Sequence, residues 1–194
     1  MKKFSIIIII IFLLFDLKLN AQKHDTPRPG FLIGTATFQY GIPTSKKVSP
    51  TYYITCRGEG FIQKNVSLIG NVDFSLPKKF QFDDILVNHS VSFGANYHFL
   101  YKHFDAYIGL QPGVSYSKAT IIDYDLSDKD KHIISPIISS TLGARYYIGW
   151  VAHVFATVGY TYGKHLSNQS NLPLSEVKIA SGIGINFNTI KEKK

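Results

Sequence analysis

The sequence predicts an all-β protein that closes into an eight-stranded antiparallel up-and-down transmembrane β-barrel. Three observations carry this prediction: a two-residue hydrophobic period, connections that alternate between short and long, and an abundance of aromatic residues, glycine and serine. A period of two indicates strands, because successive side chains on a strand point to opposite faces. An apolar face backed by a polar one suits a strand that lies between lipid and a polar lumen.

The clearest stretch is residues 88–117, NHSVSFGANYHFLYKHFDAYIGLQPGVSYS, which we interpret as a hairpin of the fourth and fifth strands. One face of this hairpin carries no charge, and the other face is mainly small or polar. The uncharged face holds Val91, Phe93, Ala95, Tyr97, Phe99, Phe104, Ala106, Ile108, Leu110, Val114 and Tyr116. This stretch therefore sets the pattern by which the other strands are recognised.

Six further strands complete the predicted set. The first three are expected at residues 31–42, 51–59 and 66–76. The sixth and seventh occupy 134–163 with a turn near 149–150, and the last is 176–187. Long polar connections are expected at 43–50, 77–87, 118–132 and 164–174, whereas the turns near 100–103 and 149–150 are short. Outer-membrane barrels show this alternation, with short periplasmic turns and long external loops.

The N-terminal segment, residues 1–21, reads as a cleaved secretory signal. It has a positive start, an apolar run over 4–15, and a plausible cleavage site before Gln22. A run of about a dozen apolar residues is too short to span a bilayer comfortably, which favours a signal over an uncleaved anchor. The barrel is then expected over 22–188, with a short polar tail over 189–194. The one cysteine, Cys56, cannot form an intramolecular disulfide.

Alternation alone leaves open which face of the strands points outward. A soluble barrel of the lipocalin kind would turn its apolar face inward around a ligand and its charged face to water. Here the polar face is rich in glycine, serine, threonine and asparagine, which suit the crowded interior of a narrow barrel. Aromatic residues also gather near the ends of the apolar runs, as an interfacial girdle requires: Tyr97, Phe99, Tyr116, Tyr146, Tyr160 and Tyr162. We therefore predict the membrane barrel and keep the soluble ligand-binding barrel as the alternative.

The chain resembles the small porin-like outer-membrane barrels of Gram-negative bacteria, the OmpA/OmpX-type eight-stranded family. The resemblance rests on two segments, the hairpin GARYYI…FATVGYTYG and the closing strand ASGIGINF. The resemblance covers the mature chain and implies a monomer in the outer membrane, in contact with lipid and lipopolysaccharide. It also implies insertion by the barrel assembly machinery, although such barrels commonly end on an aromatic residue and Phe187 is followed here by residues 188–194. The implied role is non-enzymatic: membrane integrity, adhesion or sensing through external loops, or at most a narrow pore.

Charged residues recur on the face that is predicted to line the lumen: Arg57, Glu59, Asp73, Asp105, Arg145, Glu176 and Lys178. In a barrel this narrow, opposite charges are expected to pair and to plug the lumen. The alternative is a narrow ion path lined by the same side chains. Conductance of the reconstituted protein separates these two interpretations.

One motif points to catalysis. Residues 163–168 (GKHLSN), together with Glu176, are similar to the active site of the lipid A 3-O-deacylase family, which shares this barrel. The resemblance implies that Ser167 is the nucleophile, His165 the general base and Glu176 the residue that orients the base. However, His165 and Ser167 continue the lumen-facing series of their strand, whereas that family places its pair on the lipid side. We therefore predict no enzymatic activity and keep the deacylase as the alternative.

Metal, cofactor and nucleic-acid sites are not predicted. The histidines show no pair at a metal-ligand spacing with convincing partners. The acidic residues of the third long connection lack the glycine and the closing glutamate of an EF-hand, and no glycine-rich phosphate loop leads from a strand into a helix. The net charge of +8 comes partly from the signal and the tail, and no clustered basic patch indicates nucleic acid.

Four lysines fall in the predicted external loops: Lys46, Lys47, Lys78 and Lys79. Their charge is complementary to anionic lipopolysaccharide. Contact between these lysines and lipopolysaccharide is a hypothesis, to be abandoned if neutralising all four leaves lipopolysaccharide binding unchanged.

Overall fold

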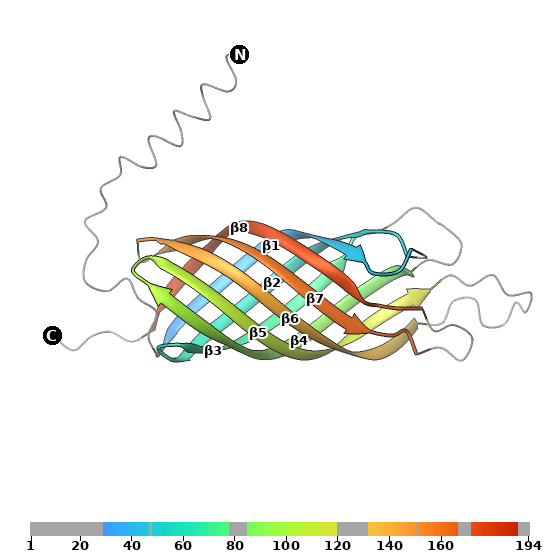
Figure 1. Ribbon diagram of the computed structural model, residues 1–194, viewed down its shortest axis with the longest axis horizontal. Coiled ribbons are helices and arrows are strands. Elements are labelled where there is room, and N and C mark those ends of the chain that lie inside the picture. The colour runs from blue at the N-terminus through green and yellow to red at the C-terminus, as the bar shows by residue number, and fades with distance from the viewer. Residues whose placement is uncertain are drawn as a thin grey trace, which may run out of the picture.

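The computed structural model describes residues 29–46, 48–77, 85–119, 132–149, 151–166 and 172–189. Within these residues the chain forms one closed barrel of eight strands (Figure 1). Each strand pairs antiparallel with its neighbours in sequence, and β1 closes the barrel by pairing antiparallel with β8. The predicted eight-stranded up-and-down barrel is confirmed. None of the described residues belongs to a helix with the length and apolar character needed to cross a membrane.

The observed strands match the predicted ones closely. They are β1 (Phe31–Pro43), β2 (Thr51–Gln63), β3 (Val66–Ser75), β4 (Ile85–Tyr101), β5 (Phe104–Ala119), β6 (His132–Ile148), β7 (Ala152–Gly163) and β8 (Glu176–Asn188). The largest difference at one strand end is in β2, which we expected to end at Glu59 and which continues to Gln63. The alternation is hard to read there because Gly58 and Gly60 have no side chains, and a register shift follows between Phe61 and Gln63.

The short turns lie at one end of the barrel, which we call the short-turn end. The turns after β4 and β6 use left-handed backbone at Lys102 (φ 53°) and Gly149 (φ 63°), a conformation common in tight hairpin turns. Phe31 at the start of β1 pairs with Asn188 at the end of β8 at this same end. The opposite end, from which the long connections leave, is called the loop end (Figure 1).

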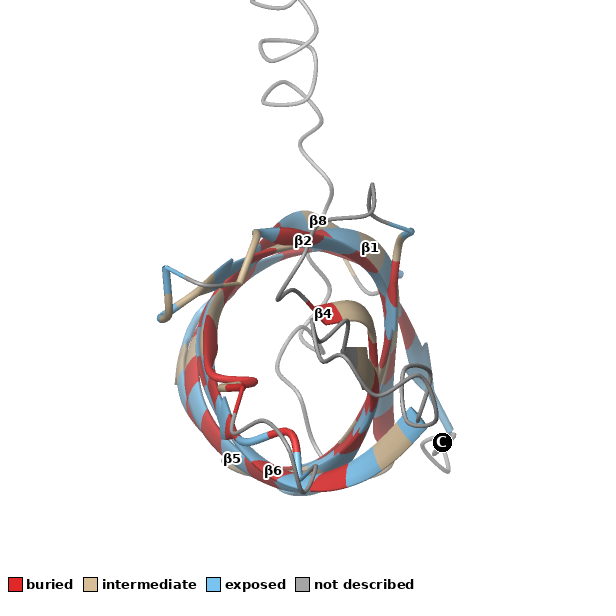
Figure 2. Ribbon diagram, turned by 90° about the vertical axis from the view of Figure 1, so that its right-hand side faces the viewer, coloured by how far each residue is buried: buried red, intermediate tan, exposed pale blue. Residues whose placement is uncertain are grey.

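The apolar side chains of the wall point outward. Ile183 is 68% exposed and Ile134 is 66% exposed, whereas inward-facing residues of the same strands, such as Asn186 and Ser135, are buried. Figure 2, which looks along the barrel, shows buried and exposed residues alternating around the wall. A continuous apolar exterior is unfavourable in water and favourable in lipid. The soluble alternative, which requires the opposite orientation, is therefore wrong.

The interior is not polar throughout. An apolar cluster near the short-turn end contains Phe31, Ile33, Phe61 and Tyr147. A second cluster at the loop end contains Ile85, Ile137, Leu172 and Leu174, with Val48 packed against it. The first of these clusters is contributed by strands, and the second also receives side chains from the connections around 48 and 172–174. Apolar groups therefore occupy both ends of an otherwise polar lumen.

Candidate functional site in the barrel lumen

A buried ion cluster joins four strands near the short-turn end. Nη2 of Arg145 (β6) lies 2.6 Å from Oε2 of Glu59 (β2), and its Nε lies 3.6 Å from Oδ2 of Asp105 (β5). His98 (β4) sits between the two acids, with Nδ1 2.9 Å from Asp105 and Nε2 3.0 Å from Glu59. All four residues are at most 3% exposed. We call this set the Arg145 cluster; its charges are tolerable in the interior because each has a partner of opposite sign.

A second polar cluster lies toward the loop end. Nζ of Lys178 is 2.6 Å from Oδ2 of Asp73 and 3.4 Å from Oε1 of Glu176. The hydroxyl of Tyr53 donates to the Glu176 carboxylate at 2.9 Å, and the Tyr53 ring centroid lies 4.5 Å from the Lys178 ammonium. The hydroxyl of Thr55 donates to Asp73 at 2.8 Å. This Lys178 cluster thus links β2, β3 and β8 across the lumen.

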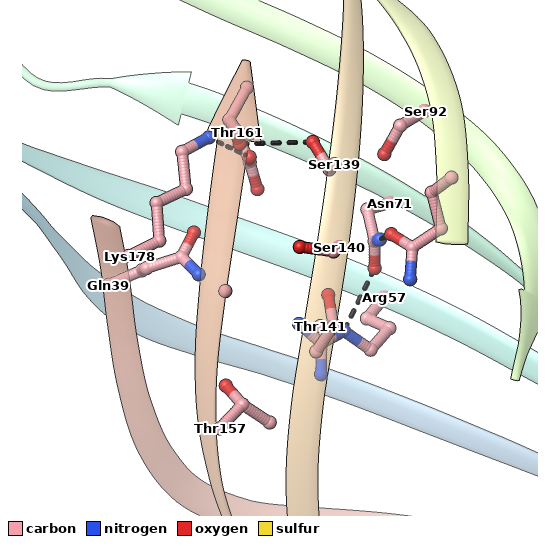
Figure 3. A pocket seen from close by; sticks show the side chains of 13 residues that line it. Gln39, Arg57, Asn71, Ser92, Ser139, Ser140, Thr141, Thr157, Thr161 and Lys178 are labelled. Carbon is pink, nitrogen blue, oxygen red and sulfur yellow. Dashed lines mark hydrogen bonds and ion pairs between the residues drawn. The ribbon is translucent and has the colours of Figure 1, made fainter. Parts of the chain in front are cut away.

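A small cavity lined by both hydroxyl and amide groups is shown in Figure 3. Its charged lining residues are Arg57, Asp73 and Lys178. The Nε of Arg57 donates to Oδ1 of Asn71 at 2.8 Å, and the Asn71 amide donates in turn to Gln111. The centre of a water molecule can reach only about 20 Å³ of this space, which is room for about one or two waters. The cavity is too small for passage of a nutrient-sized solute.

All the charged residues that the sequence assigned to the inward face lie inside the barrel. Six of them are at most 8% exposed, and Arg57 is intermediate. The sequence did not identify their histidine and tyrosine partners. Four lumen residues were given no role in the sequence analysis: His98, Tyr53, Tyr107 and Tyr147. Each lies at an alternate strand position that shares the inward face with the charged residues of its hairpin. This alternation is the signal by which these residues could have been added to the lumen network.

The six aromatic residues assigned to the girdle all point outward, with exposed fractions from 41% for Tyr160 to 59% for Phe99. They fall into two groups along the barrel. Tyr97, Phe99 and Tyr146 lie toward the short-turn end of their strands, and Tyr116, Tyr160 and Tyr162 lie toward the loop end. Two bands of this kind fit two membrane interfaces.

The structure does not assemble the alternative catalytic site. His165 is 1% exposed, and its Nδ1 lies 2.8 Å from the hydroxyl of Ser117. Burial lowers the pKa of the His165 imidazole below its usual value. The Glu176 carboxylate contacts Tyr53, Asn88 and Lys178, and no contact with His165 exists among the described residues. Ser167, the proposed nucleophile, lies outside the described residues.

A different serine–histidine–aspartate chain is present inside the Arg145 cluster. The hydroxyl of Ser67 lies 2.8 Å from Nε2 of His98, whose Nδ1 faces Asp105. This connectivity is that of a hydrolase triad. However, all three residues are fully buried, and the Ser67 hydroxyl also donates to Glu59 at 2.5 Å. A substrate carbonyl has no access, and an oxyanion would form beside a carboxylate, so this chain is structural.

In the described part of the chain, no group of three or more histidine, cysteine, aspartate or glutamate side chains is arranged to hold a metal ion. The lumen carboxylates are instead engaged by cations and hydroxyl groups of the protein, as in the contact of Lys178 with Asp73.

No protein-family model and no curated protein matches the sequence. Solved structures do match it. Neisserial surface protein A (NspA) aligns with a TM-score of 0.60 at 14% identity, covering 82% of this chain and 97% of that one. The N-terminal barrel of Pseudomonas aeruginosa OprF aligns at 0.57 and 16% identity, covering 82% and 98%, and OprG of the same organism at 0.54 and 13%, covering 85% and 99%. The chain therefore has the fold of the eight-stranded outer-membrane β-barrels.

Proposed function

We propose that this protein is a non-enzymatic outer-membrane β-barrel with a closed lumen, which contributes to membrane integrity and to contacts made by its external loops. The outward apolar face and the two aromatic bands support a position in lipid. The observation that carries the proposal is the filling of the lumen. Apolar clusters occupy both ends, and the Arg145 cluster, the small cavity and the Lys178 cluster occupy the interior.

The energy needed to open such a lumen supports the closed state. A path past the Arg145 cluster would separate the buried pair of Arg145 and Glu59, whose charged atoms lie 2.6 Å apart. Breaking a buried pair costs about 3–5 kcal/mol. Because about 1.4 kcal/mol corresponds to a factor of ten, the opened state would hold roughly 10⁻² to 10⁻⁴ of the molecules. A barrel of this kind is suited to a structural or surface role rather than to transport.

Planar-bilayer recording tests the proposal. The folded protein, reconstituted at neutral pH, is expected to give no discrete conductance steps. A porin added afterwards to the same membrane should give steps, which shows that the bilayer and the fusion protocol can report a pore. Reproducible steps from this protein alone would contradict the closed lumen and favour the narrow ion path.

The remaining parts of the proposal concern partners. We propose that the protein is a monomer, is inserted by the barrel assembly machinery, and meets lipopolysaccharide at the loop end. Lys46 is exposed beyond the end of β1, as this contact requires. Lys47, Lys78 and Lys79 lie outside the described residues.

A further inference from the structure

The imidazole ring of His98 lies between two carboxylates in the Arg145 cluster. Its Nδ1 faces Asp105, with Oδ1 at 2.9 Å and Oδ2 at 3.0 Å. Its Nε2 faces Oε1 of Glu59 at 3.0 Å and the hydroxyl of Ser67 at 2.8 Å. A neutral imidazole carries a proton on one nitrogen only and accepts with the other. A neutral ring between two ionised acids would therefore turn a lone pair toward at least one carboxylate that has no proton to donate.

The Ser67 hydroxyl does not supply the missing proton. Its oxygen lies 2.5 Å from Oε1 of Glu59, the separation of a hydrogen bond from a hydroxyl to a carboxylate. With its one proton directed to Glu59, the Ser67 oxygen can only accept from Nε2 of His98. Nδ1 must donate as well, because its hydrogen-bonding partners among the described residues are the two oxygens of Asp105. Both ring nitrogens are thus donors, as in an imidazolium.

A proton on Asp105 is the alternative way to complete the contact with Nδ1, and two features favour the histidine as its carrier. Imidazole is the stronger base, with an ordinary pKa of about 6.5 against about 3.9 for an aspartate. The contacts of Asp105 also stabilise its ionised form. The Tyr147 hydroxyl donates to Oδ2 at 3.1 Å, and Nε of Arg145 lies 3.6 Å from the same oxygen.

The charges of the whole lumen lead to the same protonation state. Among the described residues that face the lumen, three are permanent cations: Arg57, Arg145 and Lys178. Four are carboxylates: Glu59, Asp73, Asp105 and Glu176. A proton on His98 makes the two numbers equal. The rings of Phe61 and Tyr107, whose centroids lie 4.5 and 5.4 Å from that of His98, add no charge to its surroundings.

From these contacts we propose that the lumen binds one proton on His98, between Glu59 and Asp105, as a ligand of the folded state. A histidine in the unfolded chain loses its proton above about pH 6.5, so folding at higher pH is accompanied by proton uptake. The contribution of the bound proton to stability is therefore fully present below about pH 6.5 and declines as the pH rises. This proposal goes beyond the closed lumen and does not depend on the outcome of the conductance measurement.

Nitrogen-15 NMR of the histidine side chains provides the direct test. In the folded protein in detergent micelles at about pH 8, above the ordinary pKa of histidine, the two ring nitrogens of His98 should have similar chemical shifts, as in an imidazolium. His153 is the internal control, since it is also 1% exposed but its Nδ1 faces the amide oxygen of Asn186 at 2.7 Å. Its ring should be neutral, with widely separated shifts. Separated shifts for His98 as well would overturn the proposal.

The unfolding equilibrium in lipid vesicles gives a second test. If folding binds one proton, the unfolding constant of the wild type should rise by about tenfold for each pH unit between about pH 7.5 and 8.5. The His153→Gln variant should keep this slope, and His98→Gln, which cannot take up the proton, should lose it. A wild-type unfolding constant that is independent of pH over this range would refute proton binding, whether or not His98→Gln folds.

Discussion

Replacing Arg145 by methionine is expected to destabilise the barrel by about 3–5 kcal/mol, because it removes the guanidinium from the buried carboxylates of Glu59 and Asp105 and leaves them only His98 between them. Methionine retains much of the side-chain volume, so the loss is mainly electrostatic. The variant also loses the contact in which the guanidinium lies 4.4 Å from the centroid of the Tyr107 ring. Equilibrium urea unfolding in lipid vesicles, followed by fluorescence of the single tryptophan, measures the change.

Two further variants show whether the effect comes from the buried charges. Lys102→Met removes a cation from an exposed turn and should change the unfolding free energy by about 0.5 kcal/mol or less. Combining Glu59→Gln with Arg145→Met should recover part of the loss, because one of the two stranded charges is then removed. A loss below about 1 kcal/mol for Arg145→Met would mean that the Arg145 cluster is not a major source of stability.

Replacing Leu142 by arginine is expected to destabilise the barrel in vesicles by about 2–4 kcal/mol, the cost of a cation on the lipid face near the bilayer midplane. Leu142 lies well inside β6 and is 63% exposed. Its outward neighbours across the strand pairs, Ile108 and Val158, are apolar and give the new charge no partner. At a water-exposed site the same substitution would change stability by only about 0.5 kcal/mol. The free energy of unfolding in vesicles therefore reports what covers this face.

Leu166→Arg is the matched control. Leu166 is also an exposed leucine, at 56%, but it lies beyond the loop end of β7. The cost of an arginine there should fall to about 0–1 kcal/mol, since the penalty decreases toward the interface. Equal effects at Leu142 and Leu166 would contradict a lipid belt over the middle of the barrel.

The wall of the barrel could be predicted from the sequence because its determinants are local. The alternation of side chains along one strand is enough to place Leu142 on the outward face and Arg145 on the inward face. Short turns then indicate that consecutive strands pair with each other. The small residues of the polar face disfavoured the soluble barrel, which would turn that face to water. Only the orientation seen in the structure removed that alternative.

The contents of the lumen could not be predicted in the same way. Lys178 and Asp73 pair across 105 residues of sequence, and this contact depends on how barrel closure and strand tilt align side chains on different strands. The packing of Tyr107 is another example, because a Cβ added at Gly143 would lie 2.3 Å from its ring, so the tyrosine occupies the space that the glycine leaves. The sequence shows a glycine and a tyrosine but not their contact. Leu172 and Leu174 were missed because they lie in a connection, where no strand period applies.

The native cysteine allows the central claim, that the outward face lies in lipid, to be measured without any substitution. Cys56 is exposed on the outer side of β2, near the middle of the strand, and its cross-strand neighbours are Ala36 and Val72. A charged, membrane-impermeant thiol reagent is expected to leave Cys56 unmodified in the folded protein in vesicles and to modify it fully after unfolding in urea. Rapid modification of the folded, vesicle-embedded protein would show that water covers this face and would contradict the account.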